Sequence, residues 1–212
     1  SCPHPEYGSV VVEDKGNGVY HLTFKTYVSN NGFLHNTWHD TFCLEAGSYN
    51  ELFYTFQIDN VKVSHEVEEE PTDEGIDYTN DFEEETSYDI LGYVQHQASA
   101  KSFATGFDGK AIEFTHTGGH FFNFGVVENS WAEKVILPFA QGVLYSIECD
   151  FKVVALTGPQ GAETTGELTI WLHAENADGT ERWNELKVQA DGTVSCPHPE
   201  YGSVVVEDKG NG

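Results

Sequence analysis

The sequence predicts an all-β fold, a jelly roll or related β-sandwich, and three observations predict it. Short runs in which apolar and polar residues alternate recur along the chain, as in half-buried strands. Turn-forming Gly, Asn and Asp residues separate these runs. No apolar stripe with the 3.6-residue period of a helix extends over a helical length. Many short strands joined by such turns are typical of sandwiches and jelly rolls.

The expected strands follow one another at short intervals. Residues 19–28 are the first clear example, with Tyr20, Leu22 and Phe24 on one face and polar residues between them. Further strands are expected at 111–116, 120–127, 143–156, 167–175 and 185–189. Turn-forming pairs lie between the expected strands: Asp108-Gly109, Gly118-Gly119, Gly158-Pro159, Asp178-Gly179 and Asp191-Gly192.

One expected strand, residues 51–63, contains an irregularity. Apolar residues occupy alternate positions as far as Ile58, and beyond Asp59-Asn60 the apolar pair is Val61 and Val63. A change of parity within a strand is what a β-bulge produces. We therefore expect a bulge at residues 59 and 60.

The same eighteen-residue segment occurs twice. Residues 1–18 and residues 195–212 both read SCPHPEYGSVVVEDKGNG, so residue 195 repeats residue 1 and the offset is 194 residues. The simplest interpretation is a tandem array with this period. A circular permutation with a duplicated strand is the alternative.

Only one of the two identical segments can occupy its position in a given sandwich. The other copy is then a surplus strand, rich in β-branched residues, that suits an open sheet edge. The strand-exchange residues are Val10, Val11, Val12, Val204, Val205 and Val206. Exchange repeated head to tail makes a non-closing contact, which is a filament. The expected partners are therefore copies of the chain or adjacent repeats.

The cysteines do not predict a disulfide framework. Cys2 and Cys196 are the same position in the two copies, so each period contains three cysteine positions, the others being Cys43 and Cys149. An odd number argues against closed pairing. Cys149 alternates with apolar residues and is expected to be a buried free thiol.

The charge of the chain excludes several functions. The chain has 10 Lys+Arg against 35 Asp+Glu, a net charge of -25, and this surface would repel nucleic acid and anionic membranes. No apolar run approaches the roughly 18 residues needed to span a bilayer. Residues 66–85 contain eleven acidic residues and no basic one. Their first part, 66–79, has almost no apolar content and is expected to be a solvated linker.

Four short motifs, at residues 80–83, 106–114, 141–147 and 56–63, resemble those of jelly-roll carbohydrate-binding modules and concanavalin-like β-sandwich modules, as found in large bacterial tandem-repeat surface proteins. Residues 80–83 (NDFE) and 106–114 (GFDGKAIEF) resemble the opening strands of such modules. Residues 141–147 (QGVLYSI) are similar to a middle strand, and residues 56–63 (FQIDNVKV) resemble the closing strand. Because the closing motif precedes the opening one, the resemblance implies a circularly shifted module.

This order divides the chain into parts of two modules. Residues 1–65 are expected to be the C-terminal part of one repeat module, and residues 80–212 the N-terminal part of the next. The acidic linker at 66–79 then marks the boundary between the modules. The two parts can close into one sandwich within a chain or between neighbouring chains.

The resemblance also implies a structural Ca²⁺ ion between the opening and closing strands. Calcium takes six to eight oxygen ligands, and the candidates are Asp59, Asp81, Glu83 and Glu84. A solvated acidic rim is the alternative interpretation. The modules that this chain resembles stack sugars on exposed aromatic residues, for which the candidates are Trp171, Trp183, Trp131 and Trp38. Packing of these tryptophans in the core or in a subunit contact is the alternative.

Two classes of function follow. The first is a non-enzymatic structural or adhesive repeat unit of an extracellular or cell-surface protein, linked to its neighbours by strand exchange. The second is a carbohydrate-binding module that binds a polysaccharide. The duplicated segment favours the first and the motifs favour the second. No nucleophile, phosphate-binding or dinucleotide motif points to an enzyme.

Overall fold

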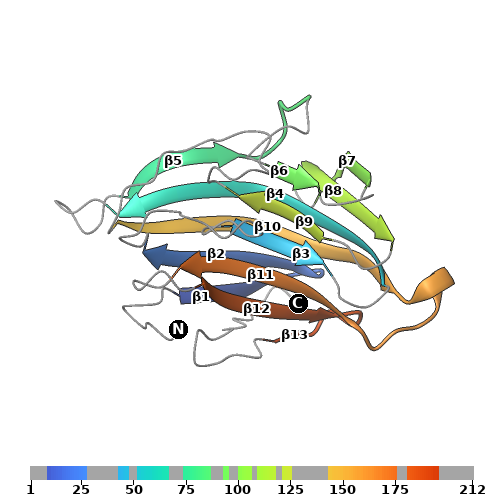
Figure 1. The fold of residues 1–212 in the computed structure, drawn as a ribbon. Coiled ribbons are helices and arrows are strands. Elements are labelled where there is room, and N and C mark those ends of the chain that lie inside the picture. The colour runs from blue at the N-terminus through green and yellow to red at the C-terminus, as the bar shows by residue number, and fades with distance from the viewer. Residues whose placement is uncertain are drawn as a thin grey trace.

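The computed structural model describes residues 9–27, 43–47, 52–66, 74–86, 93–95, 100–106, 109–117, 121–125, 143–175 and 181–195. Within these ranges the chain forms thirteen strands in two antiparallel sheets, and one short 3-10 helix, η1, at Pro159–Gly161 (Figure 1). The all-β sandwich that the alternating pattern predicts is confirmed. The circular shift stays a prediction.

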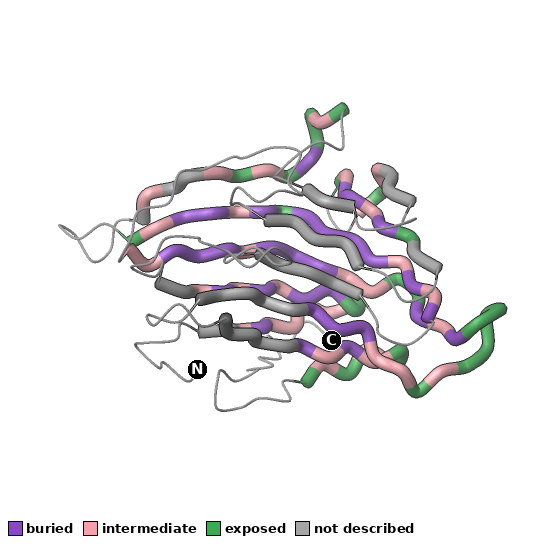
Figure 2. Tube along the Cα trace, in the orientation of Figure 1, coloured by how far each residue is buried: buried purple, intermediate pink, exposed green. Residues whose placement is uncertain are grey.

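The larger sheet has seven strands in the order β1-β2-β10-β4-β8-β7, and β5 also pairs with β4. Its strands are β1 (Ser9–Gly16), β2 (Val19–Tyr27), β10 (Leu144–Thr157), β4 (Phe53–Glu66), β8 (Lys110–Thr117), β7 (Ala100–Thr105) and β5 (Glu74–Asn80). The long strands β4 and β10 form its centre, and at least half of the residues in each are buried (Figure 2). Strand β1 is the terminal strand at one end.

The smaller sheet has six strands in the order β13-β12-β11-β3-β9-β6. Its strands are β13 (Val194–Ser195), β12 (Glu181–Gln189), β11 (Glu167–Glu175), β3 (Cys43–Gly47), β9 (Phe121–Gly125) and β6 (Tyr93–Gln95). Its terminal strand β13 ends at Ser195, where the second copy of the duplicated segment begins.

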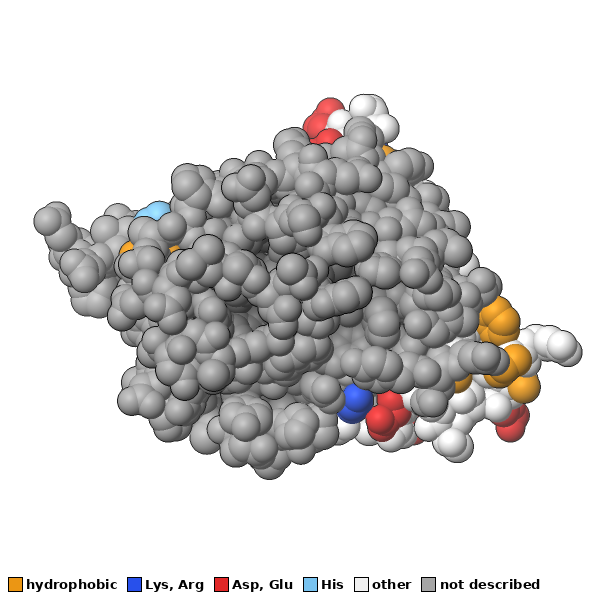
Figure 3. All heavy atoms as spheres, in the orientation of Figure 1, with side chains coloured by type: hydrophobic (Ala, Val, Ile, Leu, Met, Phe, Trp, Pro, Cys, Tyr) orange, Lys and Arg blue, Asp and Glu red, His pale blue; other side chains and the backbone are white. Residues whose placement is uncertain are grey.

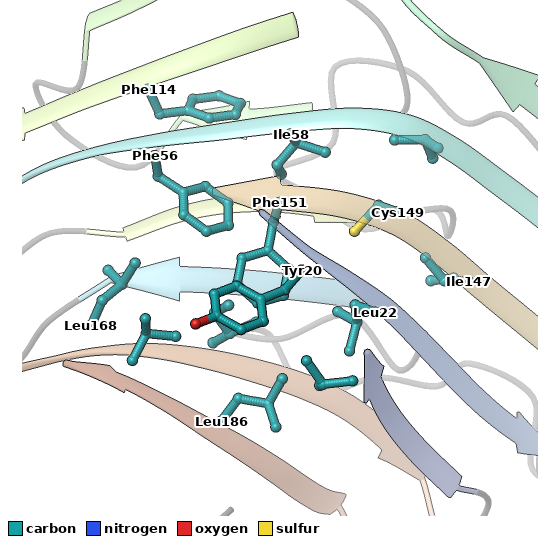
Figure 4. Close-up of a cluster of buried hydrophobic side chains, with 14 of the residues drawn as sticks. Tyr20, Leu22, Phe56, Ile58, Phe114, Ile147, Cys149, Phe151, Leu168 and Leu186 are labelled. Atoms are coloured by element: carbon teal, nitrogen blue, oxygen red, sulfur yellow. The ribbon is translucent and has the colours of Figure 1, made fainter. Parts of the chain in front are cut away.

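The core lies between the two sheets and is made of alternate residues from both. Tyr20 and Phe56 each stack on Phe151, with ring centroids 5.4 and 5.8 Å apart (Figure 4). Leu168 and Leu186 close the core from the smaller sheet. Burial of these apolar faces, at about 25 cal/mol per Å², holds the sheets together. Cys149 is a free thiol buried in this core, as expected, and its burial raises its pKa.

The bulge predicted in β4 is confirmed. Strand β4 pairs Lys62 with Glu148 and Asp59 with Asp150, so the register shifts by one residue between these pairs. Asn60 adopts a left-handed conformation (φ 51°), which Asn tolerates better than most residues. The bulge lets Ile58 and Val61, three residues apart, both reach the core.

The acidic segment is more ordered than its composition predicts. β4 extends to Glu66, β5 begins at Glu74, and these two residues pair, so residues 74–79 belong to the sheet and not to a solvated linker. The signal for β5 is the alternation of Ile76 and Tyr78, and Tyr78 packs against the core. Residues 67–73 lie outside the described residues, and a module boundary there stays a prediction.

Candidate functional site

The position of β1 in the larger sheet, which we call the edge slot, is the first candidate site. β1 pairs antiparallel with β2 from Ser9 opposite Lys25 to Gly16 opposite Val19. The two strands are joined by the pair Asn17-Gly18, which has φ values of 56° and 74°. Positive φ at both central residues is the signature of a type I′ hairpin turn, for which Asn-Gly is the favoured sequence. Residues 9–18 of the first copy therefore form a hairpin with β2.

The edge slot holds the valines expected to exchange. Val12 lies opposite Leu22 and is fully buried in the core, whereas Val11, opposite Thr23, is half-buried. The backbone of Val10 pairs with Phe24. Their counterparts, Val204, Val205 and Val206, lie outside the described residues.

The start of the second copy lies close to the slot. Tyr20, which pairs with Asp14 of β1, donates its hydroxyl proton to the carbonyl of Gly192, at 2.5 Å. Burial, together with the negative charges of Asp14 and Asp191, raises the pKa of Tyr20. Gly192 lies two residues before the first residue of β13, so the chain enters the second copy beside the hairpin end of the slot.

A polar network on the outer face of the larger sheet joins the slot to the sheet centre. Asp150 on β10 accepts hydrogen bonds from Lys15 Nζ at 2.8 Å and Asn60 Nδ2 at 2.9 Å, and its Oδ1 lies 2.7 Å from His21 Nδ1. Glu148 lies 3.6 Å from the other ring nitrogen of His21 and accepts a hydrogen bond from Lys62 at 3.2 Å. The network thus connects β1, β2, β10 and β4.

The network shifts the pKa values of its members. The carboxylates of Asp150 and Glu148 raise the pKa of His21 to about 9, which keeps its ring charged at neutral pH. Burial alone would raise the pKa of Asp150, but hydrogen bonds from His21, Lys15 and Asn60 hold it below its ordinary value. His21 and Lys62 likewise lower the pKa of Glu148. This network depends on the register of the strands, which composition and periodicity do not determine, so it was not among the predicted sites.

The end of the sheet near β5 brings together part of the expected calcium site. Asp59 is fully buried, and its Oδ2 atom has no hydrogen-bond partner among the described residues. Burial raises the pKa of Asp59 to about 6, against a hydrogen bond from the Asn60 amide, and the charges of Asp150, Glu83 and Asp81 raise it further. Strand β4, which contains the predicted closing-strand motif, therefore does lie close to the segment that follows β5.

Two glycines keep side chains out of the space beside these carboxylates. A Cβ atom at Gly106 would lie 3.2 Å from Asp59 Oδ2, and one at Gly109 would collide with the carboxylate of Glu83. Glu83 accepts a hydrogen bond from the Lys110 amide, while Lys110 Nζ donates to the Glu83 carbonyl at 2.8 Å. Phe82, between Asp81 and Glu83, is buried despite its positive φ of 59°.

The fit to a metal ion is incomplete. An unpaired buried carboxylate oxygen beside a glycine suits a hard cation. Asp81, Glu83 and Glu84 are exposed, and acidic side chains project at the end of the molecule drawn at the top of Figure 3. Among the described residues no group of three or more Asp, Glu, His or Cys side chains converges closely enough to hold a metal. The Ca²⁺ site stays a prediction in which Asp59 is the best-placed ligand.

Comparison with known proteins gives one weak likeness. No family model and no curated protein matches the chain. Among solved structures, the chain is similar to the collagen-binding subdomain of the Enterococcus faecalis surface protein ACE. The TM-score is 0.32 and the identity 10%, over 89% of this chain and 99% of that one.

The structure places two of the four candidate sugar-binding tryptophans. Trp171 on β11 pairs with Glu185, and Trp183 on β12 pairs with His173, so the two lie two rungs apart on adjacent strands. Trp131 and Trp38 lie outside the described residues. Carbohydrate binding stays a prediction. Within the described ranges, the structure contains no helix that could span a bilayer.

Proposed function

We propose that this chain is a non-enzymatic structural or adhesive repeat unit of an extracellular tandem-repeat or filament-forming protein. In this proposal, residues 203–210 of one copy occupy the edge slot of the next copy and displace residues 9–16. One observation carries the proposal. The terminal strand β1 of the larger sheet belongs to a segment that the same chain contains a second time, residue for residue.

Exchange loses no side-chain contact, because the two copies are identical. Any pair that β1 makes with β2, including the burial of Val12 against Leu22, is available to the second copy. The difference in free energy between the two arrangements therefore comes from chain connectivity. The first copy has the advantage of the two-residue turn, since closing a short loop is entropically cheap. The second copy gains as the concentration of chains rises.

The turn also supplies the hinge that exchange requires. Gly16, Asn17 and Gly18 all have positive φ, and two of the three are glycines, which adopt extended conformations equally well. Opening this hinge frees residues 9–16 without disturbing β2. Because each chain offers one strand and one slot, the contact is heterologous and repeats head to tail.

Disulfide trapping tests the proposal directly. Val11 lies opposite Thr23, so Val205 of a neighbouring chain lies opposite Thr23 after exchange. We expect a chain carrying Thr23→Cys and Val205→Cys to form covalent ladders between chains under mild oxidation. The matched control carries Thr23→Cys and Val11→Cys, which should crosslink within the hairpin. The parent chain measures the background from the four native cysteines.

Electron microscopy of the concentrated parent chain supplies an independent readout. Long regular fibres are the expected result, and their number should rise with chain concentration. Isolated globules at every concentration, together with no Thr23-Val205 ladder above the parent background, would refute strand exchange between chains.

A further inference from the structure

Lys15 is the residue through which the sheet can recognise the strand in its edge slot. We propose that the ion pair between Lys15 and Asp150 selects the strand that fills the slot and sets its register. Lys209 of the second copy forms the same pair with Asp150 when a neighbouring chain donates its strand. This inference rests on the proposed strand exchange and names the contact that makes the exchange specific.

Asp150 is built as an acceptor for this lysine. Its side chain is 3% exposed, and a carboxylate removed from water requires hydrogen-bond donors. Asn60 of β4 and His21 of β2 supply two donors from strands that stay in the sheet. The remaining donor, Lys15, belongs to the duplicated segment. An empty slot, or one filled by an unrelated strand, leaves Asp150 without this donor.

A bulge in β1 directs Lys15 toward Asp150. Asp14 pairs with Tyr20 and Gly16 with Val19, so Lys15 is an extra residue in the ladder. The Asp14 carboxylate accepts a hydrogen bond from the Gly16 amide at 2.7 Å, which stabilises this geometry. The Lys15 side chain then crosses β2 to reach β10. The second copy contains the same residues as Asp208, Lys209 and Gly210.

The ion pair fixes register together with the core. A shift of one residue would turn Val12 away from the core, because successive strand residues point to opposite faces. A shift of two residues keeps a valine in the core at Val12 or Val10 but moves the lysine away from Asp150. The lysine therefore removes the alternative registers that the Val-Val-Val run would otherwise allow.

Substitution of the two lysines in the Thr23→Cys, Val205→Cys background tests the inference. The two copies compete for one slot, so Lys209→Ala should lower the yield of disulfide between chains by roughly three- to tenfold. Lys15→Ala should raise that yield by a similar factor, because it weakens the strand already in the slot. When both lysines are substituted, the yield of disulfide between chains should be close to that of the unsubstituted background. Yields are compared after equilibration in a thiol buffer.

Lys25→Ala is the matched control, since Lys25 lies on β2 and its ion pair, with Glu66 at 4.0 Å, does not involve Asp150. It removes the same charge and should leave the yield unchanged. Equal effects of Lys15→Ala and Lys209→Ala, in direction and size, would overturn the selection by lysine while leaving strand exchange intact. Absence of any ladder in the unsubstituted background would overturn the exchange itself and this inference with it.

Discussion

A buried carboxylate with an unpaired oxygen destabilises a fold, and Asp59 is such a residue. Its Oδ2 atom is out of contact with water and faces the backbone near Gly106. In the absence of a cation the ionised group has no compensating charge of its own, because the lysine and histidine of the neighbouring network pair with Asp150 and Glu148. A cation bound to Asp59 would explain why an aspartate occupies this position.

We therefore expect Ca²⁺ to stabilise the chain through Asp59. In a chelating buffer at neutral pH, Asp59→Asn should be as stable as the parent or more stable, because it removes an uncompensated buried charge. Added Ca²⁺ should raise the melting temperature of the parent by several degrees and leave that of the variant unchanged. Differential scanning calorimetry with and without Ca²⁺ checks both statements.

Glu113→Gln is the control for a general effect of acidity, since Glu113 is an acidic residue of β8 that accepts a hydrogen bond from Gln57. This variant should keep the response to Ca²⁺. A parent chain whose melting temperature does not change with Ca²⁺, or an equal response in Asp59→Asn, would show that the acidic residues form a solvated rim.

The strands β2 and β10 are held together by charge on one face as well as by apolar packing on the other. His21 and Asp150 pair across the ladder between them, and Glu148 lies two residues away. The pKa of His21 is raised from 6.5 to about 9 in the folded chain. The charged form is therefore favoured by folding, so its contribution to stability is complete below pH 6.5 and is lost as the pH rises through 9.

The free energy of unfolding should fall by about 2 to 3 kcal/mol between pH 6.5 and 9.5 because His21 loses its proton. The measurement is urea denaturation of the parent and of His21→Gln at several pH values. The difference between the two chains isolates this histidine from other groups that titrate in the same range. Parallel curves for the two chains across this range would contradict the assignment.

Elements with long alternation could be predicted from the sequence, and short ones could not. β11 begins and ends at the expected residues, and the bulge in β4 follows from the parity change at Asp59-Asn60. β3, β6 and β7 have between three and six residues, too few for alternation to stand out. β5 was obscured because its acidic composition outweighed the alternation of Ile76 and Tyr78.

One candidate site residue could be predicted from the sequence, whereas the network around Asp150 could not. Asp59 could be predicted as a site residue because residues 56–63 resemble a closing strand. Such a resemblance indicates which strands lie next to one another. The partners of Asp150 come from β1, β2 and β4, which are up to 135 residues away along the chain. Their meeting depends on the register of three strand pairs, and composition and periodicity do not determine register. A duplicated segment, by contrast, is visible in the sequence alone.

The duplicated segment is connected differently at the two ends of the chain. The first copy is joined to its partner strand by a two-residue turn, whereas the second begins at Ser195, the last residue of β13 in the other sheet. Under the proposed exchange, substituting the same valine in one copy or the other separates the strand that a chain uses for itself from the strand that it would donate. Val12 and Val206 are this matched pair.

Val12→Asp places a carboxylate at a fully buried position and should weaken the first copy by about 3 kcal/mol or more. Its slot then accepts the second copy of a neighbour more readily, so assembly should increase.

Val206→Asp should give a monomer as stable as the parent monomer, because its own hairpin is intact and it has no strand to donate. The double variant should melt at the lowest temperature. Sedimentation velocity over a range of concentrations, with thermal denaturation, distinguishes these states. A Val12→Asp chain that remains a stable monomer at high concentration would mean that the second copy fills the slot of its own chain and that exchange between chains does not occur.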